Sequence, residues 1–208
     1  MERRVTFPSG RITLEGLLSI PGSCATAVVV CHPHPAYGGE MHNNVVQALV
    51  DAFEDRGDAT LRFNFRGTGG SGGTHGGGAA EIEDVASAVD FLLAESGVSL
   101  VAVAGYSFGA IVGMHSGMED DRVTALAGIA LPVGMMDGSF LLTCAKPKLL
   151  VAGDRDEFGP LRAVRDLFDR IPEPKTMKVV PGADHFFLGL DSEAARHASA
   201  FLDDLWAS

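Results

Sequence analysis

The stretch that most constrains the fold of this 208-residue chain is residues 101–114. It opens with the short apolar run VAVA, whose β-branched residues predict a buried strand. GYSFG follows at once, with Ser107 at its centre, and small and apolar residues typical of a packed helix continue to Met114. Strand, G-x-S-x-G and helix together predict a turn so sharp that a Cβ at Gly105 or Gly109 would collide with neighbouring backbone. Such a turn strains the backbone of Ser107 and raises its hydroxyl clear of the sheet.

The same pattern occurs a second time, as GGSGG around Ser71. Ser71 lies inside a glycine-rich loop, with no predicted strand directly before it and no predicted helix directly after it. Only Ser107 has the required context, so Ser107 is the candidate nucleophile. The chain also has an odd number of cysteines with no spacing motif, Cys24, Cys31 and Cys144, which we interpret as free thiols.

Predicted strands and helices alternate from residue 25 onward. The strands are expected at 5–8, 11–20, 25–31, 59–65, 101–104, 123–131, 148–153 and 177–180, and the helices at 43–53, 79–94, 110–114, 161–168 and 193–206. The close turn at Ser9-Gly10 indicates an antiparallel N-terminal hairpin. The alternation predicts an α/β fold with a mostly parallel central sheet and helices on both faces, in a single domain over residues 1–208.

Composition restricts the partners of the chain. The net charge of −11 at pH 7 repels phosphate backbones and anionic lipid surfaces, so we expect no nucleic-acid partner and no membrane partner. The N-terminus, MERRV, has no apolar segment typical of a secretion signal, and no apolar run approaches the length of a membrane span. We therefore expect a cytoplasmic protein and leave a homodimer open.

A serine hydroxyl needs a base within hydrogen-bond reach, and the base needs an orienting carboxylate. In an open α/β sheet these groups collect beyond the carboxyl ends of the strands. His185 follows the strand at 177–180 and is the candidate base. The strand at 148–153 is followed by three acidic candidates, Asp154, Asp156 and Glu157.

Five motifs in order give the chain a specific resemblance. They are HPHPAYGG at 32–39, RFNFRG at 62–67, GYSFGA at 105–110, GDRDEF at 153–158 and GADHFF at 182–187. The chain resembles the α/β-hydrolases, and most closely the small lidless hydrolases related to dienelactone hydrolases. The resemblance implies an α/β-hydrolase fold without a lid domain, and it selects Asp156 over Asp154 as the acid. The short connection between residues 131 and 148 also leaves no room for a cap domain.

The resemblance implies the catalytic residues Ser107, Asp156 and His185. An oxyanion hole needs two backbone N–H donors. One is expected from Phe108, the residue after the nucleophile. The other is expected from the loop after the strand at 25–31, where the prolines have no N–H. We favour His34, with Tyr37 as the alternative.

Other patterns are interpreted as structural. The four histidines His32, His34, His42 and His75 lack a carboxylate at metal-ligand spacing, so we expect no metal, and we expect no cofactor. The glycine-rich loop at 67–78 matches G-x-G-x-x-G but does not open a helix at its third glycine, so we interpret it as a mobile loop bordering the cleft. Arg66 is expected to pair with an acidic loop residue and hold its own loop, and the alternative is that it binds a substrate carboxylate.

We therefore predict a serine hydrolase that cleaves small carboxylic esters through an acyl-enzyme. A thioesterase or amidase would use the same residues, and a non-catalytic ligand-binding protein on the same fold is a further alternative. No substrate-binding residue follows from the sequence. Four apolar residues either line an acyl pocket or cover the core, namely Met135, Met136, Phe140 and Leu141.

Overall fold

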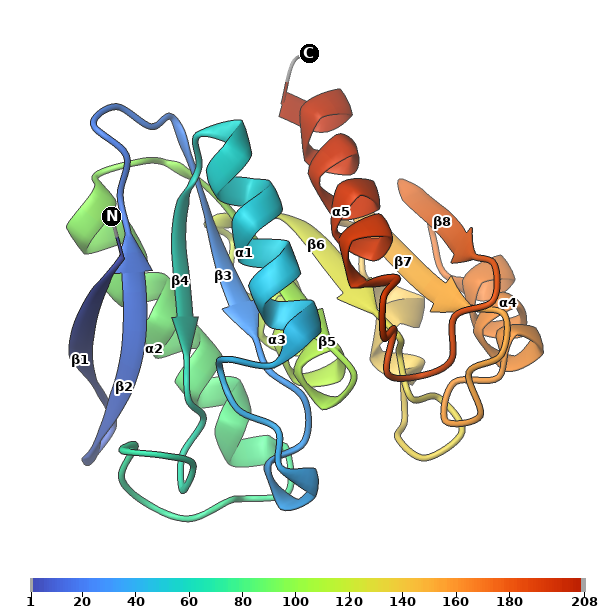
Figure 1. Ribbon diagram of the computed structural model, residues 1–208, viewed down its shortest axis with the longest axis horizontal. Helices are drawn as coiled ribbons and strands as arrows, with labels where there is room; N and C mark the ends of the chain where they lie inside the picture. The colour runs from blue at the N-terminus through green and yellow to red at the C-terminus, as the bar shows by residue number, and fades with distance from the viewer. Residues whose placement is uncertain (1, 207–208) are drawn as a thin grey trace.

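The computed structural model, which describes residues 2–206, is built around one eight-stranded sheet (Figure 1). The strands are β1 (Arg3–Ser9), β2 (Ile12–Ser19), β3 (Thr26–Cys31), β4 (Ala59–Phe63), β5 (Leu100–Tyr106), β6 (Val123–Ile129), β7 (Lys148–Gly153) and β8 (Lys175–Val180). Their order across the sheet is β1-β2-β4-β3-β5-β6-β7-β8. The central strands carry continuous apolar runs because both of their faces are covered.

The N-terminal hairpin is the antiparallel part of the sheet. β1 pairs with β2 across the Ser9-Gly10 turn, and β2 runs antiparallel to β4. All pairs from β4 through β3, β5, β6 and β7 to β8 are parallel. The predicted α/β architecture, with its antiparallel hairpin and mostly parallel sheet, is confirmed.

Helices cover both faces of this sheet, as predicted (Figure 1). They are α1 (Asn44–Arg56), α2 (Ala79–Ser96), α3 (Phe108–Glu119), α4 (Leu161–Arg170) and α5 (Asp191–Trp206), with short 3₁₀ turns at η1 (Pro35–Tyr37) and η2 (Ser139–Thr143). α1 and α5 lie side by side on one face, and α2, α3 and α4 contribute to the core on the other. Among the helices of residues 2–206, none has the length and apolar character needed to cross a bilayer.

Element boundaries moved by a few residues from the prediction, mainly because capping groups decide where a helix starts and stops. The side chain of Asn43 accepts a hydrogen bond from the N–H of Val45, so Asn43 caps α1 instead of belonging to it. Gly57 and Gly97 end α1 and α2 in the left-handed conformation. The parallel strands all run in one direction, so the segments after β3, β5, β7 and β8 emerge at one edge of the sheet.

Candidate active site

The turn after β5 gives Ser107 a backbone conformation that few non-glycine residues adopt, with φ 56° and ψ −119°. The two flanking glycines are required by sterics. A Cβ at Gly105 would lie 2.3 Å from the carbonyl oxygen of Gly109, and a Cβ at Gly109 would lie 2.4 Å from the carbonyl oxygens of Cys31 and His32. The turn therefore holds the Ser107 side chain at the N-terminus of α3, as the sequence predicted.

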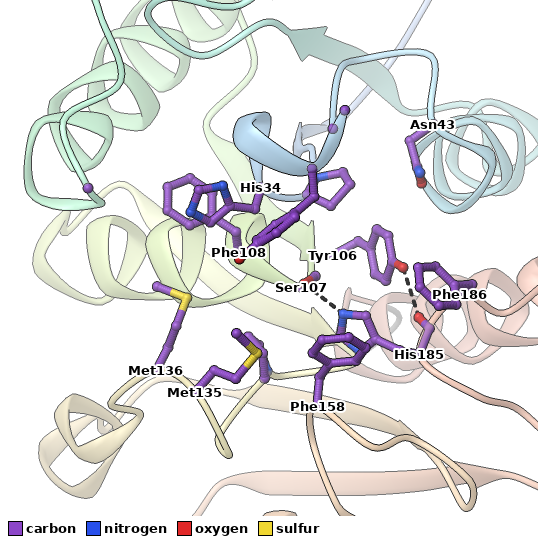
Figure 2. Close-up of a pocket in the computed structure, with 16 residues that line it drawn as sticks. His34, Asn43, Tyr106, Ser107, Phe108, Met135, Met136, Phe158, His185 and Phe186 are labelled. Carbon is purple, nitrogen blue, oxygen red and sulfur yellow. Dashed lines mark hydrogen bonds between the residues drawn. The ribbon is translucent and has the colours of Figure 1, made fainter.

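The three residues predicted as a catalytic set are joined by hydrogen bonds. Ser107 Oγ lies 2.9 Å from His185 Nε2, and His185 Nδ1 lies 2.8 Å from Asp156 Oδ2. Figure 2 shows the first of these contacts at the centre of a pocket. The structure brings Asp156 to the histidine, whereas Asp154 is exposed and accepts a hydrogen bond from the N–H of Gly182.

Backbone groups fix the two partners of Ser107. Asp156 Oδ1 accepts hydrogen bonds from the N–H groups of Phe158 and Gly159, both at 2.8 Å, which leaves Oδ2 for the histidine. The hydroxyl of Tyr106 donates to the carbonyl oxygen of His185 at 2.8 Å. A carboxylate next to Nδ1 favours the tautomer with its proton on Nδ1, which leaves Nε2 as the hydrogen-bond acceptor facing the Ser107 hydroxyl.

The two residues predicted as oxyanion donors, Phe108 and His34, line the same pocket as Ser107. Phe108 is the first residue of α3, so its N–H has no partner within the helix. His34 caps η1 and lines the same pocket. The alternative donor, Tyr37, gives its N–H to the carbonyl oxygen of His34 at 3.1 Å, so this N–H is already engaged.

His32 holds the His34 loop in place, a role that the sequence analysis did not find. It is fully buried, its Nε2 accepts the N–H of Phe65 at 3.0 Å, and its Nδ1 donates to the carbonyl oxygen of Pro33 at 2.7 Å. Burial lowers the pKa of His32 to about 4, so the ring is neutral at pH 7. Its position directly after a continuous apolar strand was the available signal.

The α/β-hydrolase domain family matches residues 26–203 of the chain. The chain belongs to this family. An uncharacterized protein of Rickettsia prowazekii is 34% identical over 205 residues, which is 94% of this chain and 85% of that protein. An α/β serine hydrolase homologue from Coxiella burnetii superposes with a TM-score of 0.88 at 32% identity, covering 96% of this chain and 97% of that one.

A third comparison bears on the lid. An α/β serine hydrolase without a lid, from Xanthomonas campestris, superposes with a TM-score of 0.89 at 28% identity and covers 99% of this chain and 94% of that one. The predicted resemblance to lidless α/β-hydrolases is confirmed at the level of the superfamily. The family and these neighbours identify the chain as a hydrolase.

The pocket of this α/β-hydrolase has a volume of about 520 Å³ and is lined mainly by apolar side chains (Figure 2). Met135 and Met136 line it, in agreement with the interpretation of this segment as part of a pocket. Phe140 and Leu141 do not. Phe140 stacks on His115 with the ring centroids 4.6 Å apart, and Leu141 is part of the buried core.

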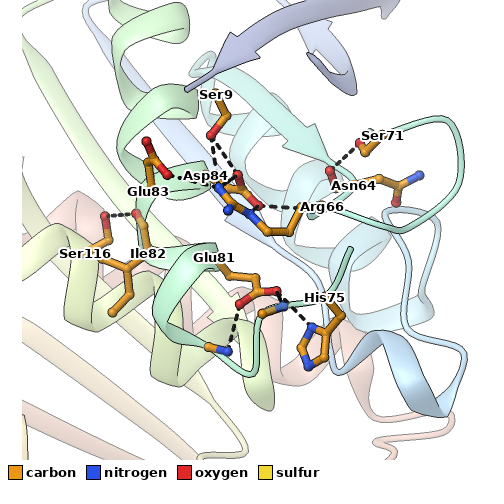
Figure 3. A network of polar contacts seen from close by, with 12 residues as sticks. Ser9, Asn64, Arg66, Ser71, His75, Glu81, Ile82, Glu83, Asp84 and Ser116 are labelled. Atoms are coloured by element: carbon orange, nitrogen blue, oxygen red, sulfur yellow. Dashed lines mark hydrogen bonds and ion pairs between the residues drawn. The ribbon is translucent and has the colours of Figure 1, made fainter. Parts of the chain in front are cut away.

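Arg66 of the hydrolase is a structural residue, but its partners are not loop residues. It forms ion pairs with Asp84 at 2.7 Å and Glu83 at 3.3 Å, and both acids belong to α2 (Figure 3). Asp84 is fully buried and also accepts a hydrogen bond from the hydroxyl of Ser9. The expectation of an acidic loop partner was wrong because α2 packs directly under the glycine-rich loop.

A second buried carboxylate on α2 fixes the end of that loop. Glu81 accepts hydrogen bonds from the N–H groups of Gly76 and Gly78 at 2.6 and 2.7 Å, and His75 Nδ1 lies 2.9 Å from it (Figure 3). Burial alone would raise the pKa of Glu81, but these N–H groups and His75 lower it. His75 in turn packs on His34, with ring centroids 4.7 Å apart, so this loop reaches the pocket.

The remaining predicted features lie away from Ser107. Ser71 is buried and bonds the carbonyl oxygen of Asn64 at 2.6 Å and the N–H of Glu15 at 3.0 Å, which is a structural role. Within residues 2–206, no group of three His, Cys, Asp or Glu side chains could hold a metal ion. The three cysteines have free thiols.

Proposed function

We propose that this hydrolase cleaves small carboxylic esters through an acyl-enzyme formed on Ser107. The observation that carries the proposal is the unbroken line of hydrogen bonds from Ser107 through His185 to Asp156, with Ser107 and His185 lining a pocket. A serine in a strained turn, a histidine hydrogen-bonded to it and a buried carboxylate behind the histidine are what acyl transfer requires.

In the first half of the reaction, Ser107 Oγ attacks the ester carbonyl carbon while His185 Nε2 takes the hydroxyl proton. Asp156 holds the ring in the Nδ1–H form and stabilises the imidazolium that results. The tetrahedral intermediate collapses when the C–O bond to the leaving alcohol breaks. His185 returns its proton to that oxygen, and the alcohol departs.

In the second half, water takes the place of the alcohol. His185 removes a proton from the water as it attacks the acyl carbon, and the same proton then goes to Ser107 Oγ as the acid is released. In both halves negative charge develops on the former carbonyl oxygen. We assign the stabilisation of this charge to the N–H groups of Phe108, at the start of α3, and of His34, in the loop after β3. Each such donor lowers the barrier by about 3 kcal/mol.

The first test is covalent labelling of the purified protein with a fluorophosphonate probe, which reacts with activated serines. We expect labelling of the wild type, none of Ser107→Ala, and labelling slowed by at least about a hundredfold in His185→Ala. A folded wild type that does not label would refute the proposal and favour the non-catalytic binding protein.

The second test ranks bond types. Matched phenyl acetate, thiophenyl acetate and acetanilide share an acyl group and present an ester, a thioester and an amide to the same residues. We expect the highest kcat/KM for the ester. A thioester or amide preference would keep the acyl-enzyme mechanism and replace the substrate class.

A further inference from the structure

The chemistry of the proposed reaction determines on which side of the pocket the leaving group and the acyl chain of the ester lie. His185 Nε2 takes the proton from Ser107 and returns it to the leaving group, so the leaving oxygen must come within hydrogen-bond reach of the same nitrogen. The rest of the leaving group then extends over or past the His185 ring. The acyl chain, bonded to the carbon that Ser107 attacks, must extend elsewhere.

Aromatic rings border the His185 side. The Phe158 ring centroid lies 4.7 Å from that of His185, and the Phe186 centroid lies 6.0 Å from it with the planes at 84°. The two phenylalanines are 6.3 Å apart and nearly perpendicular, at 79°. Phe186 is 53% exposed, so an edge or face of the ring is open to a ligand. Two rings at right angles form a corner that an aromatic group fills with one stacked and one edge contact.

Methionines border the other side. Figure 2 shows Met135 and Met136 on the far side of Ser107 from Phe186. Both come from the segment after β6 and line the pocket. Methionine has three rotatable bonds and a polarizable sulfur, so a pair of them adapts to flexible aliphatic chains of different length.

Along its described lining, the pocket offers no carboxylate, ammonium or guanidinium group that could pair with a charged substrate. Among its lining residues, all within the described chain, none is Asp, Glu, Lys or Arg. Asn43 is its only amide side chain, and this amide oxygen accepts the N–H of Val45 as the cap of α1. A charged substituent on either side of the ester would lose its hydration without gaining a counter-ion.

We propose that the two sides of the pocket are separate subsites: Phe158 and Phe186 bind an aromatic leaving group, and Met135 and Met136 bind an uncharged aliphatic acyl chain. The preferred substrates are then aryl esters of aliphatic acids. This inference rests on the proposed serine hydrolase function, because the assignment of sides follows from the proton path through His185.

The aromatic subsite is tested with acetates that share one acyl group. The measured quantity is the aryl-to-alkyl ratio, which is kcat/KM for 2-naphthyl acetate divided by kcat/KM for trifluoroethyl acetate. The two substrates share the acyl group and differ only in the leaving group. Phe186→Ala should lower this aryl-to-alkyl ratio about three- to tenfold, as expected for the loss of one aromatic pair. Phe186→Leu keeps apolar bulk without a ring and should also lower the ratio.

A matched control comes from the same loop. Leu188 is 76% exposed and does not line the pocket, so Leu188→Ala removes a similar apolar side chain without touching the subsite. Its ratio should equal that of the wild type. An unchanged ratio in Phe186→Ala would overturn the aromatic subsite. A full wild-type ratio in Phe186→Leu would show that bulk and not aromaticity is recognised, and would overturn the aryl assignment.

The acyl subsite is tested with p-nitrophenyl esters of rising chain length. Each methylene buried against the methionines raises kcat/KM by up to about fourfold. Met136→Ala should lower the hexanoate-to-acetate ratio at least about threefold while leaving the naphthyl-to-trifluoroethyl ratio as it is. If instead Met136→Ala changes the leaving-group ratio and Phe186→Ala changes the chain-length ratio, the two sides have been assigned in reverse.

The failure of this inference is distinguishable from the failure of the proposed function. If the wild type releases p-nitrophenol in a burst and labels at Ser107, but Phe186→Ala and Met136→Ala both keep the wild-type substrate ratios, the proposed function stands and the two subsites are refuted. A wild type that neither labels nor turns over any ester loses both.

Discussion

Replacing Asp156 by asparagine should prevent His185 from acting as a base without disturbing the loop that holds residue 156. The two N–H groups of Phe158 and Gly159 point at Oδ1, so in Asp156→Asn the amide oxygen must occupy that position. The NH₂ group then takes the place of Oδ2, 2.8 Å from His185 Nδ1. An NH₂ group can only donate, so Nδ1 must accept, and the ring proton moves to Nε2, where it blocks proton transfer from Ser107.

The expected loss in kcat is about 10³- to 10⁴-fold, which corresponds to about 4 to 5.5 kcal/mol of transition-state stabilisation. The free energy of unfolding should stay close to the wild-type value, because the two loop hydrogen bonds persist. Asp156→Ala loses the same activity and also leaves both N–H groups without an acceptor, which costs about 2 kcal/mol of stability. Comparing Asp156→Asn with Asp156→Ala therefore separates the effect of the His185 tautomer on kcat from the effect of the loop hydrogen bonds on stability.

The assay pairs p-nitrophenyl acetate turnover with urea unfolding and with ¹⁵N NMR of the histidine ring, which distinguishes Nδ1–H from Nε2–H. Asp154→Asn is the matched control, because Asp154 is exposed and lies two residues away in the same loop. Its kcat should equal that of the wild type. A kcat for Asp156→Asn within about tenfold of the wild type, or an Nδ1–H ring in that variant, would refute the tautomer argument.

Three further predictions concern the frame of the site. Ser71→Ala, which removes one buried and one partly buried hydrogen bond of the second G-x-S-x-G match, should lower the unfolding free energy by about 2 kcal/mol but leave kcat within about twofold; a large loss of kcat in a folded variant would contradict the structural role. Gly109→Ala forces a methyl group against two backbone carbonyls and should destabilise the fold by about 3 kcal/mol or more in thermal unfolding; a melting temperature equal to the wild type would show that the turn is not tight. Because the pKa of His32 falls from about 6.5 to about 4 on folding, the unfolded chain binds the proton first as the pH drops. Unfolding free energy should therefore fall by about 3 kcal/mol between pH 7 and pH 4 through this group, and urea titrations should show a shallower pH dependence in His32→Gln.

Much of the fold was predictable because its signals are local. The apolar runs of β3, β5 and β7 and the alternation with helices were enough to establish a mostly parallel sheet. The meeting of Ser107, His185 and an acidic residue after β7 was predictable for the same reason, whereas the choice of Asp156 over Asp154 and Glu157 came from the family resemblance. Parallel strands end at one edge, so short segments after β5, β7 and β8 come together there.

What the sequence did not reveal depends on contacts between distant segments. Glu81 and Asp84 read as ordinary acidic residues in the first turns of a helix, where charge favours the helix dipole. They are fully buried because the glycine-rich loop folds back over α2 and supplies their N–H and guanidinium partners. The pairing of His32 with Phe65 joins segments 33 residues apart, and no local pattern specifies it.

The division of the site along the chain has a consequence for folding. Ser107 follows β5, near the middle of the chain. Asp156 and His185, which are proposed to activate it, follow β7 and β8, the last two strands in the sequence. A growing polypeptide thus carries a complete serine turn well before residue 185 has been synthesised, and that serine has no base. The proposed esterase activity should therefore appear only once the last strand has docked. For a refolding chain, the rate of ester hydrolysis would then report on this final assembly step.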